Sequence, residues 1–234
     1  MTMPAAIGRR LGDYRFTDSD GTPVALAQFR GKPIVVSLIY TSCAHVCPTI
    51  TQTLARSVAL ARAALGEASF TVLTVGFDSA VDTPAQLRRY AAERGVLGTP
   101  GWHFLATDAA TMQRLAGDLG FIYYASPKGY DHLSQTTIVD ATGVVYRQVY
   151  GERYALPTLV EPLKQLVYGT RANASSLDGI LNGVRLFCTV FDPASGRYTF
   201  DYSLPLAVLV GLASLGAVAV FIVRAWREGR AART

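Results

Sequence analysis

The feature that most constrains this 234-residue chain is a run of 22 residues without a formal charge, YSLPLAVLVGLASLGAVAVFIV, from Tyr202 to Val223. As an α-helix rising about 1.5 Å per residue, this run spans the roughly 30 Å hydrocarbon core of a bilayer. Its apolar residues occupy every side of such a helix, which excludes an amphipathic surface helix. A buried core helix is the alternative, but core helices rarely continue so far without a charge. We therefore expect a transmembrane helix over residues 202–223.

Basic residues follow this run directly. Residues 224–234 contain four arginines and one acid, Glu228, and so carry +3 of the chain's net charge of +5. Because positive charge stays on the cytoplasmic side of a membrane, we expect a basic cytoplasmic tail and a body that faces the periplasm from the inner membrane. The rest of the chain is near neutral and has no basic stripe with interleaved aromatics, which excludes a nucleic-acid partner.

The N-terminal residues contain no export signal that we recognise. The sequence MTMPAAIGRRLGDYRF has a pair of arginines, but it lacks the apolar stretch that a secretory signal requires. We expect a segment upstream of these residues to direct export of the body.

Apolar runs rich in β-branched residues alternate with helical stripes over residues 8–168. The runs at 34–40, 70–77 and 102–106 are typical of buried strands, and each precedes a predicted helix. Hairpins are expected within 14–26 and 136–150, and a final helix at 156–168. Repeated βα units with antiparallel additions predict an α/β fold with a mixed sheet flanked by helices. Residues 169–200 predict a linker and a small strand-turn extension, so the chain has one main domain.

Two of the three cysteines lie close together in the element TSCAHVCP, residues 41–48. Cys43 and Cys47 follow a predicted buried strand and begin a helix, where α/β sheets place their ligands. If both lie in the first helical turn, their Cα atoms are about 6 Å apart, within disulfide range. A helix N-terminus also lowers the pKa of a thiol. The pair therefore predicts either a disulfide or a soft-metal site.

Three histidines could complete a metal site. His45, between the cysteines, should point away from both, and His103 lies in a strand flanked by large apolar residues that favour a place in the core or on a face of the sheet. His132 starts a predicted strand after a loop with Pro127 and Gly129, so it can reach the end of a neighbouring strand. Two thiolates and one imidazole suit Cu(I), and also Cu(II), better than a closed zinc site, which needs four ligands.

Four elements together carry a resemblance to a known family. TSCAHVCP is followed by FDSAVDTP (77–84), GWHFL (101–105) and DHLSQTTIVDATG (131–143), and this series resembles the Sco/SenC family in order and spacing over about residues 8–168. The resemblance implies a thioredoxin-like fold and a copper site formed by Cys43, Cys47 and His132. Ala44, Ser79 and Leu133 replace residues usual in that family, but none of these changes removes a ligand.

The resemblance also implies a function. Members of that family help to metallate the dinuclear copper A site of cytochrome c oxidase, either by delivering copper or by reducing the cysteines of that site. The chain is thus expected to be a membrane-tethered copper chaperone, whose partners are the oxidase subunit that carries the copper A site and other copper chaperones.

Several alternatives stay open from the residues alone. A thiol-disulfide oxidoreductase would cycle Cys43 and Cys47 by exchange, with copper incidental, so whether the protein is an enzyme is undecided. A peroxidase fits poorly, because Thr41 is in place but a second cysteine follows four residues after Cys43. Asp78 is interpreted as a residue of the helix approach rather than an acid near the metal. Cys188 is interpreted as an inert buried thiol, the alternative being a thiol that meets copper or a partner near the membrane.

Overall fold

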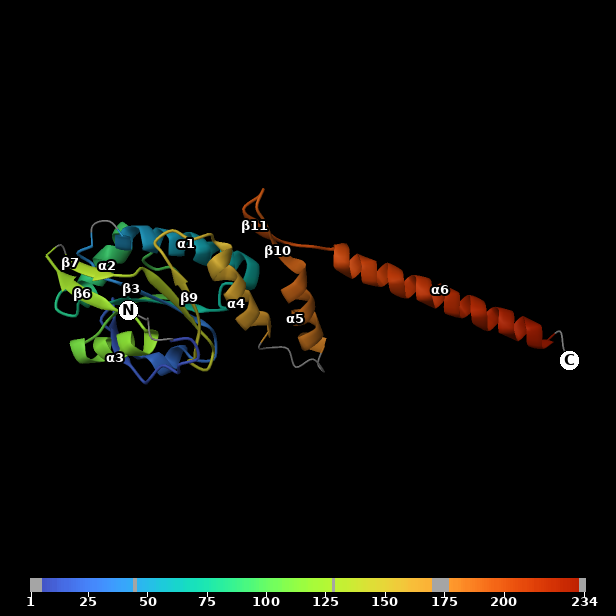
Figure 1. Ribbon diagram of the computed structural model, residues 1–234, viewed down its shortest axis with the longest axis horizontal. Coiled ribbons are helices and arrows are strands. Elements are labelled where there is room, and N and C mark those ends of the chain that lie inside the picture. The colour runs from blue at the N-terminus through green and yellow to red at the C-terminus, as the bar shows by residue number, and fades with distance from the viewer. Residues whose placement is uncertain (1–5, 44–45, 128, 170–176, 232–234) are drawn as a thin grey trace. The chain divides into compact units, whose positions relative to one another are not determined.

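The computed structural model describes residues 6–43, 46–127, 129–169 and 177–231 (Figure 1). The chain divides into two compact units, Met1–Leu186 and Phe187–Thr234. The first unit contains a seven-stranded sheet, and the second contains a small hairpin and a long apolar helix.

The central sheet has the strand order β2-β1-β5-β4-β3-β8-β9. Neighbours β3, β4 and β5 run parallel, and every other pair is antiparallel, which confirms the predicted mixed sheet. All six residues of β3 and of β4 are buried, as expected for central strands covered on both faces. The strands are β1 (Arg15–Asp18), β2 (Pro23–Ala25), β3 (Ile34–Ile39), β4 (Thr71–Gly76), β5 (Trp102–Ala106), β8 (Gln135–Val139) and β9 (Val145–Tyr150).

Helices cover both faces of this sheet (Figure 1). Helix α1 packs against α4, and α2 packs against β5, whereas α3 lies on the opposite side of the sheet. Thr83 and Asp108 cap α2 and α3, because their side chains accept the backbone N–H groups of residues 86 and 111. The helices are α1 (Val46–Leu65), α2 (Pro84–Glu93), α3 (Ala109–Leu119) and α4 (Pro157–Gly169), with a short 3-10 helix at Leu26–Phe29.

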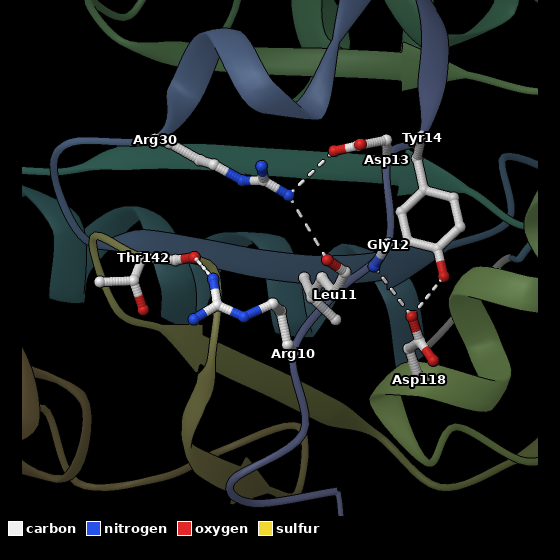
Figure 2. Close-up of polar contacts among 8 residues, drawn as sticks. All are labelled: Arg10, Leu11, Gly12, Asp13, Tyr14, Arg30, Asp118 and Thr142. Atoms are coloured by element: carbon white, nitrogen blue, oxygen red, sulfur yellow. Dashed lines mark hydrogen bonds and ion pairs between the residues drawn. The ribbon is translucent and has the colours of Figure 1, made fainter.

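Polar contacts fasten the segment before β1 to the rest of the first unit (Figure 2). Asp118 of α3 accepts hydrogen bonds from the Gly12 backbone, at 3.1 Å, and from the Tyr14 hydroxyl, at 2.5 Å. Burial and this carboxylate raise the pKa of Tyr14. On the other side of the segment, Arg30 forms an ion pair with Asp13 at 3.0 Å. These contacts hold the N-terminal segment beside α3 and the 3-10 helix.

A small hairpin follows α3, where the sequence predicts a loop. It consists of β6 (Tyr123–Ser126) and β7 (Gly129–His132), paired antiparallel so that Tyr123 faces His132. His132 is therefore the last residue of β7, and the expectation that it starts the next sheet strand was wrong. The physical reason is that Tyr123 and Tyr124 favour a strand, while Pro127 and Gly129 are residue types that favour a turn.

Residues after α4 form more structure than a linker with a strand-turn element. The predicted strand-turn element is present as β10 (Thr189–Asp192) and β11 (Arg197–Phe200), but helix α5 (Leu177–Cys188) was not predicted. Helix α6 (Ser203–Ala231) contains an apolar stretch, Pro205–Arg224, with a mean hydropathy of 2.7 and no buried residues. By length and composition this stretch is able to cross a membrane.

Candidate metal centre

Cys43 and Cys47 meet where β3 leads into α1. Cys47 lies in the first turn of α1, but Cys43 precedes the helix, so the two do not share one helical turn as expected. Instead the Cys43 sulfur, three residues before the start of α1, accepts the backbone N–H of Cys47 at 3.3 Å. Both cysteines are buried, and neither forms a disulfide. His45, between them, lies outside the described residues.

The Cys47 thiol has a higher pKa than the sequence predicts. Its hydrogen bond to the Cys43 sulfur and its burial together raise the pKa of Cys47 well above the ordinary value for a thiol. Negative charge on Cys43 and Asp82 acts in the same direction. The favourable field of the helix N-terminus is therefore outweighed, and the expected lowering of the thiol pKa does not hold for Cys47.

A buried acid that the sequence analysis missed organises the loops around the cysteines. Asp82 is 2% exposed and accepts three hydrogen bonds, from the Thr41 N–H at 2.8 Å, the Thr41 hydroxyl at 2.7 Å and the Asp78 N–H at 2.9 Å. Burial raises the pKa of Asp82 above its ordinary value despite these bonds. A Cβ on Gly76 would lie 2.4 Å from the Asp82 Cβ, so the end of β4 needs glycine. An acid directly before Thr83-Pro84 was the available signal, but the sequence singled out only Asp78 in this loop.

His132 belongs to an aromatic cluster rather than to the cysteine pair. The aromatic cluster consists of Tyr40, Phe77, Phe121, Tyr123, Tyr130 and the His132 ring. The His132 ring meets Phe77 edge-on at 5.2 Å and Tyr40 edge-on at 6.0 Å between centroids. Its Nδ1 atom lies 3.3 Å from the carbonyl oxygen of Leu133.

Tyr40 contacts both parts of the candidate site. Its hydroxyl group hydrogen-bonds to the Cys43 side chain and to the Tyr130 backbone in the hairpin. Burial and the Cys43 side chain raise the pKa of Tyr40. Gly129, at φ +117°, lies so close that an added Cβ would be 2.8 Å from the Tyr40 hydroxyl oxygen. Asp78 also reaches the hairpin, because its carboxylate hydrogen-bonds to the Tyr130 side chain.

The structure thus brings together two of the three predicted ligands. Cys43 and Cys47 touch, and His132 lies beyond Tyr40 on the hairpin. Over the part of the chain that the structure describes, no three His, Cys, Asp or Glu side chains are grouped closely enough to hold a metal ion. The donors are chemically suited to copper, but His132 and the cysteines must approach one another for all three to bind one ion.

The remaining candidates lie elsewhere. His103 pairs with Asp18 of β1 at 2.7 Å and packs on Phe29, which agrees with the expected place in the sheet. Cys188 is buried in the second unit, as the interpretation of an inert thiol requires.

Comparison with known proteins agrees with this fold. The family model described as SCO1/SenC matches residues 5–167, and no curated protein matches the chain. The chain resembles the crystal structure of a candidate electron transfer protein from Aquifex aeolicus VF5, with 28% identity and a TM-score of 0.63, covering 70% of this chain and 95% of that one.

Two further solved structures are similar in fold. Copper-bound ScoI from Bradyrhizobium japonicum has 22% identity and a TM-score of 0.55, over 66% of this chain and 98% of that one. BsSco, a member of the Sco family of cytochrome c oxidase assembly proteins with a disulfide switch, has 20% identity and a TM-score of 0.61, over 68% and 94%. The family model covers well over half of the residues, and the mixed sheet and the cysteine pair agree with it. The chain therefore belongs to the SCO1/SenC family.

Proposed function

We propose that this protein is a membrane-tethered copper-binding assembly factor that helps to metallate the copper A site of a respiratory cytochrome c oxidase. The observation that carries the proposal is the contact between two buried cysteines without a disulfide, Cys43 and Cys47, at the carboxyl end of a central strand. The family, and a copper-bound relative with the same fold, support copper as the cargo.

Cys43, Cys47 and His132 would hold the copper. Two sulfurs and one imidazole favour Cu(I) and also accept Cu(II). In the structure described here, the Tyr40 hydroxyl hydrogen-bonds to the Cys43 side chain, and the aromatic cluster holds the His132 ring. Binding by all three residues would therefore exchange the Tyr40–Cys43 contact for metal ligation and shift hairpin β6–β7 relative to α1.

The C-terminal segment would anchor this domain. We propose one domain at 8–168, a linker and extension at 169–200, a transmembrane helix at 202–223 and a cytoplasmic tail at 224–234. The arginines of that tail support a cytoplasmic tail and a periplasmic domain. An anchor confines the domain to the membrane that holds the oxidase subunit with the copper A site, which raises the effective concentration of the two partners.

A thiol-disulfide oxidoreductase is the second candidate function. It is favoured by the direct contact of two cysteines that are not joined by a disulfide, and by a relative in which a disulfide switch is described. In that reaction, the thiols of Cys43 and Cys47 would be oxidised to one disulfide, giving two electrons and two protons to a target disulfide. The target would be reduced to two thiols, ready to receive copper.

Copper stoichiometry of the purified full chain tests the first function. One copper per chain is expected, with loss of binding in Cys43→Ala and Cys47→Ala and a marked loss of affinity in His132→Ala. Matched controls are Cys188→Ser, in the second unit, and His103→Ala, which pairs with Asp18; both should bind copper like the unchanged chain.

His132 separates the two candidate functions. A reductase needs only the cysteines, so His132→Ala should reduce a model disulfide at an unchanged rate. Unchanged copper affinity in that variant would refute the three-ligand site.

A further inference from the structure

Helix α5 ends beside the start of the apolar helix α6. The backbone N–H of Asp201 donates to the carbonyl of Cys188 at 2.6 Å, and Thr189 pairs with Phe200. Residues 188 and 201 are therefore neighbours at the base of hairpin β10–β11. The last turn of α5 is fixed next to the residues that lead into α6.

Exposed apolar side chains gather at this junction. Phe187 is 76% exposed, Val190 is 48% exposed and Tyr202 is 72% exposed. Among the second-unit side chains that the structure describes, Phe187 stays largely uncovered, although an exposed phenylalanine in water is unfavourable.

The junction has the composition of a membrane interface. Five aromatic residues occur between 187 and 202, and Phe191 packs on Tyr198 as Phe200 packs on Tyr202. Aromatic side chains concentrate where a membrane meets water. At about 1.5 Å per residue, Asp201 lies roughly 6 Å along the chain from the apolar stretch that begins at Pro205, which is about the thickness of the headgroup zone on one side of a bilayer.

We propose that the C-terminal end of α5 and hairpin β10–β11 form a lipid-contacting surface, with Phe187 and Val190 inserted into the interfacial layer of the leaflet in which α6 begins. The proposal rests on α6 crossing the membrane as proposed above. The occupant is lipid because this surface is continuous with the apolar helix that the bilayer must already cover. Residues 187–202 contain two acids and one arginine, so the attraction is apolar and does not select anionic lipids.

This surface would fix the height of the junction above the bilayer. Without it, α6 could slide or tilt within the membrane, because an uncharged stretch of this length is not pinned on that side by its own charges. Phe187 and Val190 would resist such movement at the start of the span, as the arginines do at its other end.

Photo-crosslinking of the full chain in phosphatidylcholine vesicles tests the proposal. Benzoylphenylalanine replaces Phe187 or Val190 in separate variants, and mass spectrometry identifies what the probe captures after illumination. Phe221, exposed in the middle of α6, is the positive position, and Tyr150, exposed on the sheet edge of the first unit, is the control. Lipid adducts are expected at 187, 190 and 221 and only background adducts at 150.

Each outcome decides a different point. Lipid adducts at 221 with none at 187 and 190 would overturn the surface and leave the transmembrane helix intact. Capture of a second copy of the chain at 187 would assign the surface to self-association and also overturn it. Absence of lipid adducts at 221 as well would refute the membrane span and the surface together.

Discussion

The buried carboxylate of Asp82 should contribute more to stability than any other acid of the first unit that the structure describes. Replacing it with alanine leaves the Thr41 N–H, the Thr41 hydroxyl and the Asp78 N–H without their acceptor. Each buried donor without an acceptor costs about 1–3 kcal/mol, and the sum is reduced because the variant no longer buries a carboxylate. We expect Asp82→Ala to lower the free energy of unfolding by about 3–5 kcal/mol.

Urea denaturation of residues 1–186, the first compact unit, measures this change. Trp102 is the only tryptophan in that piece and is buried in β5, so its fluorescence reports unfolding. With a slope of about 2 kcal/mol per molar urea, the midpoint should fall by roughly 1.5–2.5 M.

Asp140 provides a matched control. Its carboxylate also accepts three hydrogen bonds, from the Thr142 N–H, the Thr142 hydroxyl and the Val144 N–H, but it lies in a partly exposed turn. Water can replace the acceptor there, so Asp140→Ala should cost only about 1 kcal/mol. Equal losses in the two variants, or a loss below about 1 kcal/mol for Asp82→Ala, would refute the reasoning from burial.

Three further changes test the same region. Burial holds the folded-state pKa of Asp82 above its ordinary value of 3.8, so just above pH 3.8 the folded chain binds more protons than the unfolded chain. The free energy of unfolding should therefore fall as the pH rises through this range. Asp82→Asn should flatten this fall in urea titrations between pH 3 and 8, and an unchanged slope would show that Asp82 does not cause it. Gly76→Ala places a methyl group 2.4 Å from the Asp82 Cβ, so we expect the free energy of unfolding to fall by about 2–4 kcal/mol in the same assay. The control Gly117→Ala has open space at its Cβ, so its free energy of unfolding should fall far less. Tyr40→Phe removes the hydroxyl that hydrogen-bonds to Cys43 and to the hairpin backbone. Each lost bond removes about 1 kcal/mol of stabilisation, so iodoacetamide should alkylate the cysteine pair several-fold faster. An unchanged rate would show that Tyr40 does not shield the pair.

Local signals in the sequence were enough to predict the central sheet and the position of the cysteines. The runs that became β3 and β4 are apolar and rich in β-branched residues. This composition alone indicates a strand that is buried on both faces of a sheet. The caps Thr83 and Asp108 act on residues three positions away, so their role is visible within one turn. Cys43 and Cys47 were found because the strand-to-helix junction is itself a local feature.

Features that depend on contacts between distant segments could not be predicted. Asp82 is buried because Thr41, 41 residues earlier, and Gly76 at the end of β4 both close around it. The raised pKa of Cys47 likewise depends on burial and on the Cys43 sulfur, which local helix-terminus reasoning omits. Helix α5 was missed for a different reason, because its Asp-Gly and Asn-Gly pairs at 178–179 and 182–183 are typical of turns.

The sheet topology explains why the candidate ligands lie on separate loops that nevertheless meet. Strands β3 and β4 run parallel with Ile39 beside Gly76, so the loops that follow them leave the same edge of the sheet. One loop carries Cys43, and the other carries Asp78 and Asp82. Hairpin β6–β7 is joined to both, because Tyr130 receives contacts from Tyr40 on the first and from Asp78 on the second.

The position of His132 is therefore set by two hydrogen-bonded contacts and by aromatic packing, rather than by the cysteines. Each neutral hydrogen bond contributes about 1 kcal/mol, and a bond to a carboxylate contributes about twice that. A shift of the hairpin toward Cys43 and Cys47 thus costs a few kcal/mol, which is well within what metal ligation supplies. Under the proposed copper-delivery function, the same contacts would return the hairpin when the copper leaves, as release of a cargo requires.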